Sequence, residues 1–454
     1  MVPGEFQRQY VMSPWQNHPQ KVGLLGRLAV STGIGLIATT HGLATLIGAG
    51  ILAVVLLPVH AGRRVRMTPV LVLLLGWCWL SVTWSVMPAF SVRNAVSLTL
   101  VSAAAALLAA RCCWHLLAHC VALGLGGVCA LCIGWGIFLP DRSFQGEGRL
   151  QGFLAHPNQL GYIAALALLS AVGLFVVGER RWLYGLLWLP NLVGLWWSDS
   201  VTSAMGVIGA LTVCYLFSLA GQHRQRRLLS AGVFAGFGVL GGVWLLLNQE
   251  VVFTLLGRDA SLTGRTTVWE LVSALAREHP VRGYGLGAPW AENSPVLAWL
   301  TDRLGFEVIG AHNGPLEIVL HLGVVGLGLV TWLVGQAFFK WLKVTQSPPP
   351  TTIWGLALIT FVIIHNVTEG ALLGNGEFLI LVLLLLAPTP TSDINGRCTI
   401  PGVPRRAADR LWAPWVPSPH AGAGTGSRAL VGSSGPHRGS HHAPQREKLR
   451  PGQE

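Results

Sequence analysis

Long apolar stretches recur along this 454-residue chain, and they constrain its fold more than any other feature. Each stretch runs for about 16 to 25 residues, close to the length of helix that crosses roughly 30 Å of hydrocarbon. Only 11% of the residues are charged, against about 25% in a typical soluble domain. So few charges cannot cover a large surface that faces water. We therefore expect an all-α integral membrane protein, because helices satisfy their own backbone hydrogen bonds in lipid.

The apolar stretches predict about twelve transmembrane helices between residues 24 and 388. Residues 1–23 form a polar N-terminal segment without the pattern of a cleavable signal peptide. Residues 389–454 form a basic tail rich in Pro, Gly and Ser, which we expect to be disordered. The longest segment between spans, 248–314, precedes the tenth span. The expected spans are 24–39, 42–59, 68–86, 95–110, 116–139, 158–177, 182–197, 203–220, 228–247, 315–339, 353–373 and 376–388.

The distribution of basic residues predicts the orientation. If both termini are cytoplasmic, all but eight of the 31 basic residues fall in cytoplasmic segments, as the positive-inside rule requires. Segment 248–314 is then a large loop on the non-cytoplasmic side of the membrane. The planar guanidinium of arginine suits phosphate and carboxylate groups, although pairing with nearby acidic residues is the alternative. The eight outer basic residues are all arginine: Arg93, Arg142, Arg149, Arg258, Arg265, Arg277, Arg282 and Arg303.

Cysteine and histidine spacing predicts no metal site and no cofactor. Cys129 and Cys132 form a CxxC pair, but it lies in the middle of an apolar span. A redox or zinc site needs access and polar neighbours, so we interpret the pair as packing residues. The chain also contains no P-loop and no nucleophile elbow.

Two parts of the large loop have a recognisable pattern. Residues Thr263–Glu278, TGRTTVWELVSALARE, carry apolar side chains at helical spacing. The segment VRGYGLG follows, and its glycines Gly283, Gly285 and Gly287 permit close backbone approach. This loop has the composition of a phosphate cradle, but a purely structural loop is the commoner meaning of such glycines.

The segment AHNGPLE, residues 311–317, leads into the tenth span. Pro315 suits the first turn of a helix, with Asn313 or Gly314 at its cap. His312 then lies just ahead of a helix N-terminus, whose free N–H groups favour an anion. A histidine beside a bound anion is suited to general-base catalysis. The alternative is a histidine that only caps the membrane interface.

Further polar residues cluster at the same face. Segment GRLQGFLAHPNQLG, residues 148–161, carries Arg149, and its His156 and Asn158 more often serve as polar groups at a helix start than as ligands. Polar groups at membrane depth are costly and often line a cavity. Two more polar groups lie at this face: Ser198, Asp199, Ser200, Thr202 and Ser203, and His365, Asn366, Thr368 and Glu369.

Taken in order, these segments resemble the O-antigen ligase and polymerase superfamily of bacterial envelope enzymes, most closely its exopolysaccharide-production branch. The segments are WSVMPAFSVRNAVSL, GRLQGFLAHPNQLG, LTGRTTVWE with VRGYGLGAPW, and AHNGPLE. The likeness covers about residues 68–388. Many relatives carry a serine next to a basic residue near the start of the eighth span, whereas SDSVTSAMG here has no basic residue. The likeness therefore does not extend to a charge pair at that position.

The resemblance implies metal-independent glycosyl transfer at the periplasmic face of the bacterial cytoplasmic (inner) membrane. The implied donor is a glycan linked to undecaprenyl diphosphate, and an acceptor hydroxyl displaces the lipid diphosphate. By match to the family's motifs, Arg149 and Arg265 bind the diphosphate and His312 is the base. The resemblance implies no cofactor. Residues of second rank are Arg93, Arg282, Tyr284, Asn313 and Glu317.

The acceptor stays open. A polymerase would use another lipid-linked repeat unit, which the branch resemblance modestly favours, and a ligase would use lipid A-core; protein O-glycosylation is a weaker third alternative. Other polysaccharide-assembly proteins are implied partners, and nucleic acid is not. The alternative from another class is a lipid-linked glycan transporter or flippase. A transporter is expected to place broken helices and polar residues near mid-membrane, often in repeated halves, whereas the polar residues here lie mostly at one face.

Overall fold

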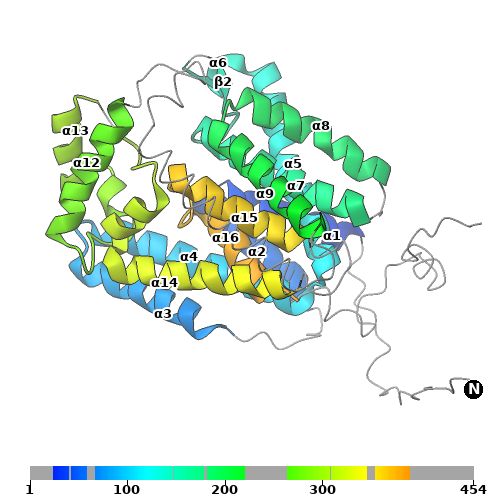
Figure 1. Cartoon of the computed structure of the whole chain (residues 1–454), viewed down its shortest axis with the longest axis horizontal. Coiled ribbons are helices and arrows are strands. Elements are labelled where there is room, and N and C mark those ends of the chain that lie inside the picture. Colours follow the sequence, from blue (N-terminus) through cyan, green and yellow to red (C-terminus); the bar gives the residue numbers. More distant parts are fainter. Residues whose placement is uncertain are drawn as a thin grey trace, which may run out of the picture. The chain divides into compact units, whose positions relative to one another are not determined.

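The computed structural model describes residues 24–39, 42–58, 67–146, 148–177, 181–219, 263–306, 308–344 and 353–388. These residues are mostly helical, as the sequence predicts (Figure 1). The strands within these ranges are the two-residue pieces β1 (Phe144–Gln145) and β2 (Arg149–Leu150), which pair antiparallel. The predicted all-α membrane class is therefore confirmed, while the count of twelve spans stays a prediction.

Every expected span outside 228–247 corresponds to a helix, and 228–247 itself lies outside the described residues. Within the described ranges, four helical stretches are long and apolar enough to cross a membrane: Pro88–Arg111, Trp114–Phe138, Pro157–Val176 and Gly314–Lys343. The helices that match expected spans are α1 (Leu24–Ala38), α2 (Gly42–Leu56), α3 (Pro69–Leu80) continued by the 3₁₀ turn η2 (Ser81–Trp84), α4 (Pro88–Arg111), α5 (Trp114–Phe138), α7 (Pro157–Val177), α8 (Arg181–Trp197), α9 (Val201–Leu219), α14 (Gly314–Val344), α15 (Ile353–Thr368) and α16 (Asn375–Leu386). The remaining elements are α6 (Pro140–Ser143), α12 (Thr263–Glu278), η3 (Ala288–Trp290) and α13 (Pro295–Leu304).

Several helix boundaries differ from the expected ones, for identifiable reasons. Helix α4 begins at Pro88, whereas the expected span began at residue 95. The expected start was late because the first turns of α4 carry the polar Arg93 and Asn94 and so lie outside the apolar stretch. Proline at the first turn of α3 and α4 suits a helix start, since no intrahelical partner is needed for its missing N–H. Helix α15 ends at Thr368, several residues before the expected 373.

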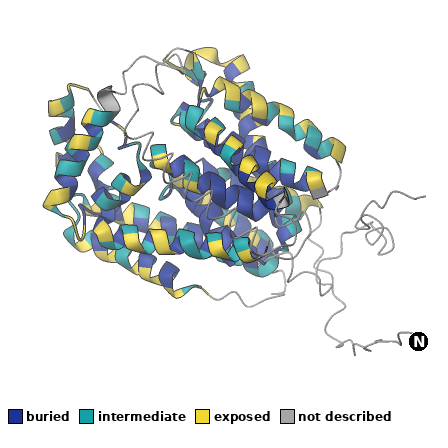
Figure 2. Ribbon diagram, viewed as in Figure 1, coloured by how far each residue is buried: buried dark blue, intermediate teal, exposed yellow. Residues whose placement is uncertain are grey.

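Helix α7 lies at the centre of the packing and contacts α5, α8, α9 and α15. Figure 2 shows buried residues gathered in the middle of the bundle and exposed residues on the outer helix faces. Many of the exposed side chains are large and apolar, including Leu25, Phe138 and Trp196, each 82% exposed. A soluble protein rarely exposes so much apolar surface, whereas lipid covers it without cost.

Small residues allow the first helices to pack closely. A Cβ atom at Gly124 of α5 would lie 2.3 Å from the Ser31 carbonyl oxygen of α1, so only glycine fits there. The CxxC cysteines Cys129 and Cys132 are both buried and free. Their interpretation as packing residues is therefore confirmed.

Helix α14 is broken at Gly323, whose φ of 68° and ψ of −172° are not helical. The glycine-rich loop that follows α12 fills this break. Its Tyr284 and Gly285 N–H groups donate to the Leu320 and His321 carbonyls, both at 2.9 Å, and the Val324 N–H donates to Pro280 at 2.8 Å. The loop N–H groups at these positions are thus committed to protein carbonyls. The structural alternative for this loop fits the structure, and the phosphate cradle does not.

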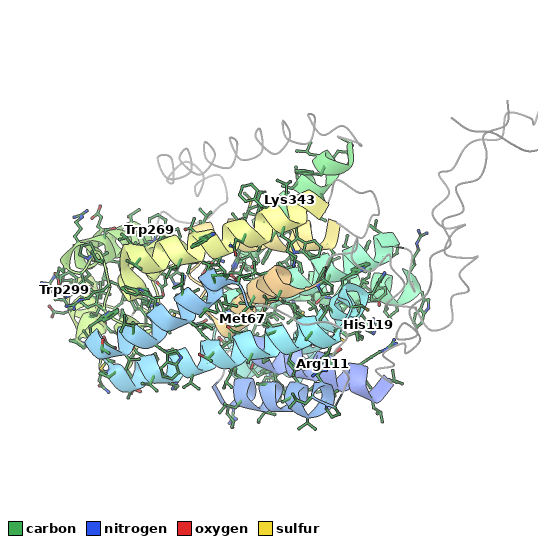
Figure 3. The ribbon with its side chains drawn as sticks, turned by 90° about the horizontal axis from the view of Figure 1, so that it is seen from below. Met67, Arg111, His119, Trp269, Trp299 and Lys343 are labelled. Carbon is green, nitrogen blue, oxygen red and sulfur yellow. The ribbon has the colours of Figure 1, made fainter. Side chains whose placement is uncertain are left out.

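Helices α12 and α13 lie at the end of the bundle where α14 begins (Figure 1) and share a small core of their own that includes Val272 and Leu300. The Tyr284 hydroxyl is 2.7 Å from Glu278 Oε2, and burial together with this carboxylate raises the pKa of Tyr284. Figure 3 shows Trp299 at this end of the molecule, and Arg111 and Lys343 toward the opposite end. The two basic residues that the charge pattern assigns to the cytoplasmic side therefore lie toward the same end.

Candidate functional site

A chain of hydrogen bonds joins four polar side chains. They come from β2, from the first turn of α7, from the residue after α15 and from the loop before α14. The hydrogen-bond chain runs from Arg149 through Asn158 and Glu369 to His312. Two of these residues, Arg149 and His312, are 163 positions apart in the sequence, and both were predicted as site residues. The structure brings them into one network.

Arg149 is held from three directions. Its Nε donates to the Ser198 carbonyl at 3.1 Å, and its Nη2 atom contacts Asn158 Oδ1 at 2.6 Å and the Asp199 carbonyl at 3.4 Å. Asp199 has a φ of 47°, an uncommon conformation for a residue other than glycine. The turn between α8 and α9 therefore fixes the direction of the guanidinium group. This turn is one of the polar clusters noted in the sequence.

Asn158 links the arginine to an acid. While its Oδ1 accepts from Arg149, its Nδ2 donates to Glu369 Oε1 at 2.7 Å. The backbone N–H of Asn158 donates to His156 Nδ1 at 3.1 Å in the first turn of α7. Asn158 and His156 are thus hydrogen-bonded polar groups at a helix start, as expected. Asn158 also connects Arg149 to Glu369. The amide cannot be reversed without placing its NH₂ against the guanidinium.

His312 is oriented by Glu369. Its Nδ1 lies 3.0 Å from Glu369 Oε2, and the two side chains are 24% and 8% exposed. An ionised carboxylate only accepts hydrogen bonds, so Nδ1 carries the hydrogen and Nε2 is left to accept a proton. The φ of His312 is 50°, a strained value that is often found at functional sites. The geometry is that of a base oriented by a carboxylate.

Asn313 and Glu317 hold the segment that carries His312. Asn313 Oδ1 accepts the Leu316 N–H at 3.0 Å, which confirms the predicted cap of α14. Glu317 Oε2 accepts the Ala311 N–H at 2.9 Å. The backbone is therefore fixed on both sides of His312. These two residues of second rank support the site rather than enter the network of Arg149 and Glu369.

The other expected site residues lie outside this network, or their side chains lie outside the described part of the structure. Arg93 is exposed, with its guanidinium carbon 4.8 Å from the centre of the Phe90 ring. Arg282 is exposed too, and Tyr284 is buried in the core of α12 and α13. Arg265 belongs to the first turn of α12, but its side chain lies outside the described residues. Its role as a diphosphate ligand stays a prediction.

Sequence reasoning gave Glu369 no role, although this residue joins the network together. A carboxylate at the end of an apolar stretch is costly unless it has partners. The position of Glu369 in the sequence could therefore have indicated that it has polar partners. Glu377 was missed altogether. It lies 2.6 Å from His365 Nδ1, in a pair that is 0% and 1% exposed. Asn366 Nδ2 donates to the second oxygen of Glu377.

Comparison with known proteins finds a family model and a curated relative that this chain resembles. Residues 186–331 match the sequence model of a family described as O-antigen ligase. The chain is also 30% identical over 234 residues to the exopolysaccharide production protein ExoQ of Rhizobium meliloti (strain 1021). That match covers 46% of this chain and 52% of the relative, so the chain spans about half the length of the curated protein it matches. The resemblance to the O-antigen ligase superfamily and its exopolysaccharide branch is confirmed.

Proposed function

From this likeness to the O-antigen ligase superfamily, we propose that the chain is a membrane glycosyltransferase. It transfers a glycan from undecaprenyl diphosphate to an acceptor hydroxyl at the periplasmic face of the cytoplasmic membrane, and so builds a cell-surface polysaccharide. The match to an O-antigen ligase family supports a polysaccharide-related membrane enzyme. The single observation that carries the chemistry is the hydrogen-bond chain from Arg149 to His312.

His312 acts as the general base in this proposal. The acceptor oxygen forms a bond to the anomeric carbon, the bond from that carbon to the diphosphate oxygen breaks, and His312 Nε2 takes the hydroxyl proton. Glu369 accepts the Nδ1 hydrogen at 3.0 Å and stabilises the imidazolium that forms. General-base catalysis of this kind contributes about 10²–10⁴-fold in rate.

Arg149 and Arg265 neutralise the diphosphate, which is both the binding handle of the donor and the leaving group. Positive charge held where negative charge develops lowers the barrier, because no reorganisation is needed during the reaction. For Arg149 the fixed geometry is visible in its contacts to Ser198, Asp199 and Asn158. Two arginines supply this charge without a metal ion, so we propose metal-independent transfer.

The test of this proposal is transfer by the purified protein. A synthetic undecaprenyl diphosphate glycan is supplied with candidate acceptors, in detergent, with and without EDTA. Transfer that survives EDTA supports the metal-independent glycosyltransferase, and transfer abolished by EDTA and restored by a divalent cation contradicts the absence of a metal. Donor binding without transfer to any acceptor would favour a flippase. A pure transporter forms no glycosidic bond, so transfer product made in detergent, without a sealed membrane, would exclude a purely transport role.

The matched family and the matched relative support different acceptors. The family description names O-antigen ligation, and the name of the relative refers to exopolysaccharide production. We favour polymerisation, because the more specific likeness is to the exopolysaccharide protein. A deletion strain decides between them. Accumulation of single lipid-linked repeat units indicates a polymerase, and accumulation of long lipid-linked polymer indicates a ligase.

A further inference from the structure

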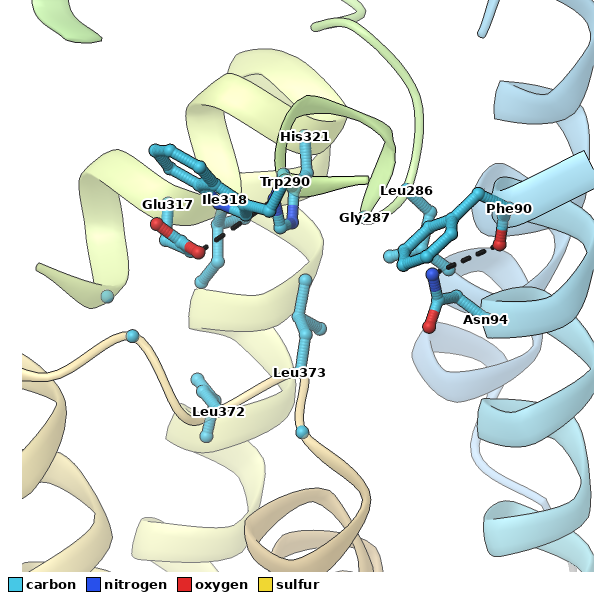
Figure 4. Close-up of a pocket in the computed structure, with 13 residues that line it drawn as sticks. Phe90, Asn94, Leu286, Gly287, Trp290, Glu317, Ile318, His321, Leu372 and Leu373 are labelled. Atoms are coloured by element: carbon cyan, nitrogen blue, oxygen red, sulfur yellow. Dashed lines mark hydrogen bonds and ion pairs between the residues drawn. The ribbon is translucent and has the colours of Figure 1, made fainter. Parts of the chain in front are cut away.

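A cavity of about 190 Å³ lies beside the segment that carries His312 (Figure 4). Its walls come from the first turns of α4 and α14, from η3 and from the loop between α15 and α16. None of the residues of the network from Arg149 to His312 lines it. The lining residues include Phe90, Asn94, Trp290, Glu317, His321 and Leu373.

His321 is a buried polar side chain that needs a partner. It is 6% exposed, and neither ring nitrogen makes a hydrogen bond within the described part of the chain. Its Nε2 lies 3.9 Å from Glu317 Oε1, which is beyond hydrogen-bond distance. A buried group left without a partner costs about 1–3 kcal/mol. A ligand with hydroxyl groups would remove this cost, because each hydroxyl can both donate and accept.

The other walls complete a surface that suits a sugar ring. Glu317 also lines the cavity: its Oε2 accepts the Ala311 N–H, and its Oε1 lies 3.9 Å from His321 Nε2. Asn94 Nδ2 donates to the Phe90 carbonyl at 3.1 Å, which leaves Oδ1 as an acceptor. The rings of Phe90 and Trp290 supply flat apolar faces (Figure 4). A pyranose has the matching chemistry, since its C–H faces are apolar and its hydroxyl groups lie around the edge.

The cavity is connected to the proposed base through shared segments. Gly314, which lines the cavity, is two residues from His312, and Gly370, which also lines it, follows Glu369 directly. A Cβ atom at Gly370 would come within 3.1 Å of Glu317 Cγ, so glycine keeps this wall open. The bond from Ala311 to Glu317 further ties the cavity wall to the backbone beside His312.

We propose that this cavity is the subsite for one pyranose ring of the acceptor, from which a hydroxyl reaches His312. This inference rests on the proposed glycosyl transfer. The volume of about 190 Å³ is less than the ~300–1,000 Å³ of pockets for larger ligands. The subsite therefore holds a single ring, and the rest of the acceptor extends outside it.

Direct binding of simple sugars tests the subsite. The full chain, purified in detergent, is titrated with methyl glycosides of glucose, galactose, mannose and rhamnose in both anomeric forms, and binding is followed by saturation-transfer NMR. We expect at least one of these glycosides to bind. His321→Phe should weaken that binding about tenfold or more, since it removes a hydrogen-bond partner. Leu373→Phe should weaken it too, by filling the cavity while every polar group stays in place.

Trp299→Ala is the matched control, because Trp299 belongs to α13, does not line the cavity and stacks on Arg303 at 3.8 Å. It should bind the glycosides as the wild type does. Gel filtration and thermal midpoints identify variants that do not fold, and the folded one of the two cavity variants then decides. Failure of the wild type to bind any glycoside would overturn the subsite. Unchanged binding by a folded cavity variant would overturn it as well.

The transfer assay separates this inference from the proposed function. If the wild type transfers glycan and the cavity variants keep an unchanged KM for acceptor, the subsite is wrong while the glycosyltransferase stands. If the wild type binds a glycoside that both cavity variants lose, but transfers nothing, the sugar site stands and the proposed reaction is wrong.

Discussion

Two histidine–carboxylate pairs flank the end of helix α15, and they differ mainly in access to solvent. His312 and Glu369 are 3.0 Å apart, with the histidine 24% exposed. His365 and Glu377 are 2.6 Å apart and essentially unexposed. The two pairs are neighbours, because the Glu369 N–H donates to the His365 carbonyl at 3.1 Å.

The difference separates a chemical role from a structural one. The His365 ring stacks on Phe361, at 5.2 Å between centroids and 17° between planes, and Asn366 occupies the second oxygen of Glu377. No substrate reaches such a pair without unfolding the helices around it. The pair of His312 and Glu369, here called the open pair, has the same kind of imidazole–carboxylate contact, but its histidine is partly exposed. Access and the surrounding groups, rather than the contact itself, are the grounds on which we propose His312, and not His365, as the base.

The largest expected effect is on the open pair. His312→Ala should lower kcat by about 10²–10⁴-fold, the usual contribution of a general base, while the thermal midpoint in detergent stays near that of the wild type. His279→Ala is the control, since its ring packs edge-on against Tyr284 and takes no part in the network. A folded His312→Ala protein with wild-type kcat would exclude this base.

The second effect concerns the closed pair and is expected in stability. Glu377→Ala leaves His365 without its buried partner and should lower the free energy of unfolding by about 3–5 kcal/mol. The double variant His365→Phe, Glu377→Leu should recover most of this loss, because both polar groups are then removed together. Thermal unfolding of the purified proteins measures both. A single variant as stable as the wild type would contradict a structural role for the pair.

An intermediate effect is expected for the residue that orients the base. Glu369→Gln presents an amide to His312 and cannot stabilise an imidazolium by charge. We expect kcat to fall about a hundredfold, the lower end of the range for loss of general-base catalysis, with the KM for donor little changed. Initial rates at varied donor concentration give both constants. A large rise in KM at unchanged kcat would instead assign Glu369 to donor binding.

The smallest expected effect is that of Arg149→Lys. Lysine keeps the charge but cannot reach Ser198 and Asn158 at once as the guanidinium does. Loss of one charge-assisted hydrogen bond, worth about 1.5 kcal/mol, should raise the KM for donor roughly tenfold. Kinetics with the undecaprenyl diphosphate donor measure this change. Arg142→Lys is the control, because Arg142 is exposed on α6 and is not part of the network. Full activity of Arg149→Lys would reduce the role of Arg149 to that of a diffuse charge.

Local patterns in the sequence were enough to predict most of the helices and the cap of α14. Apolar length located the spans, and Asn313 with Pro315 located the start of a helix, because each of these signals acts within a few residues. Polar first turns, as in α4, fall outside any apolar stretch, and the expected boundary there was late.

The candidate site was predicted only in part, because its contacts join distant segments. The Asn158–Glu369 bond spans 211 positions and the His312–Glu369 bond spans 57. Arg149 and His312 were identified through family motifs, whereas Glu369 and Glu377 matched no motif. The cavity was not foreseen either, since Trp290 and His321 become neighbours only when the glycine-rich loop packs into the break of α14.

The most direct test of this account is glycan transfer from a synthetic undecaprenyl diphosphate donor, measured side by side for two folded proteins. One is His312→Ala, and the other is the double variant His365→Phe, Glu377→Leu. We expect the first to transfer glycan at least about a hundredfold more slowly than the wild type, and the second to transfer it at a rate close to that of the wild type. A folded His312→Ala protein with a rate near that of the wild type, or an inactive but folded double variant, would contradict this assignment of the base.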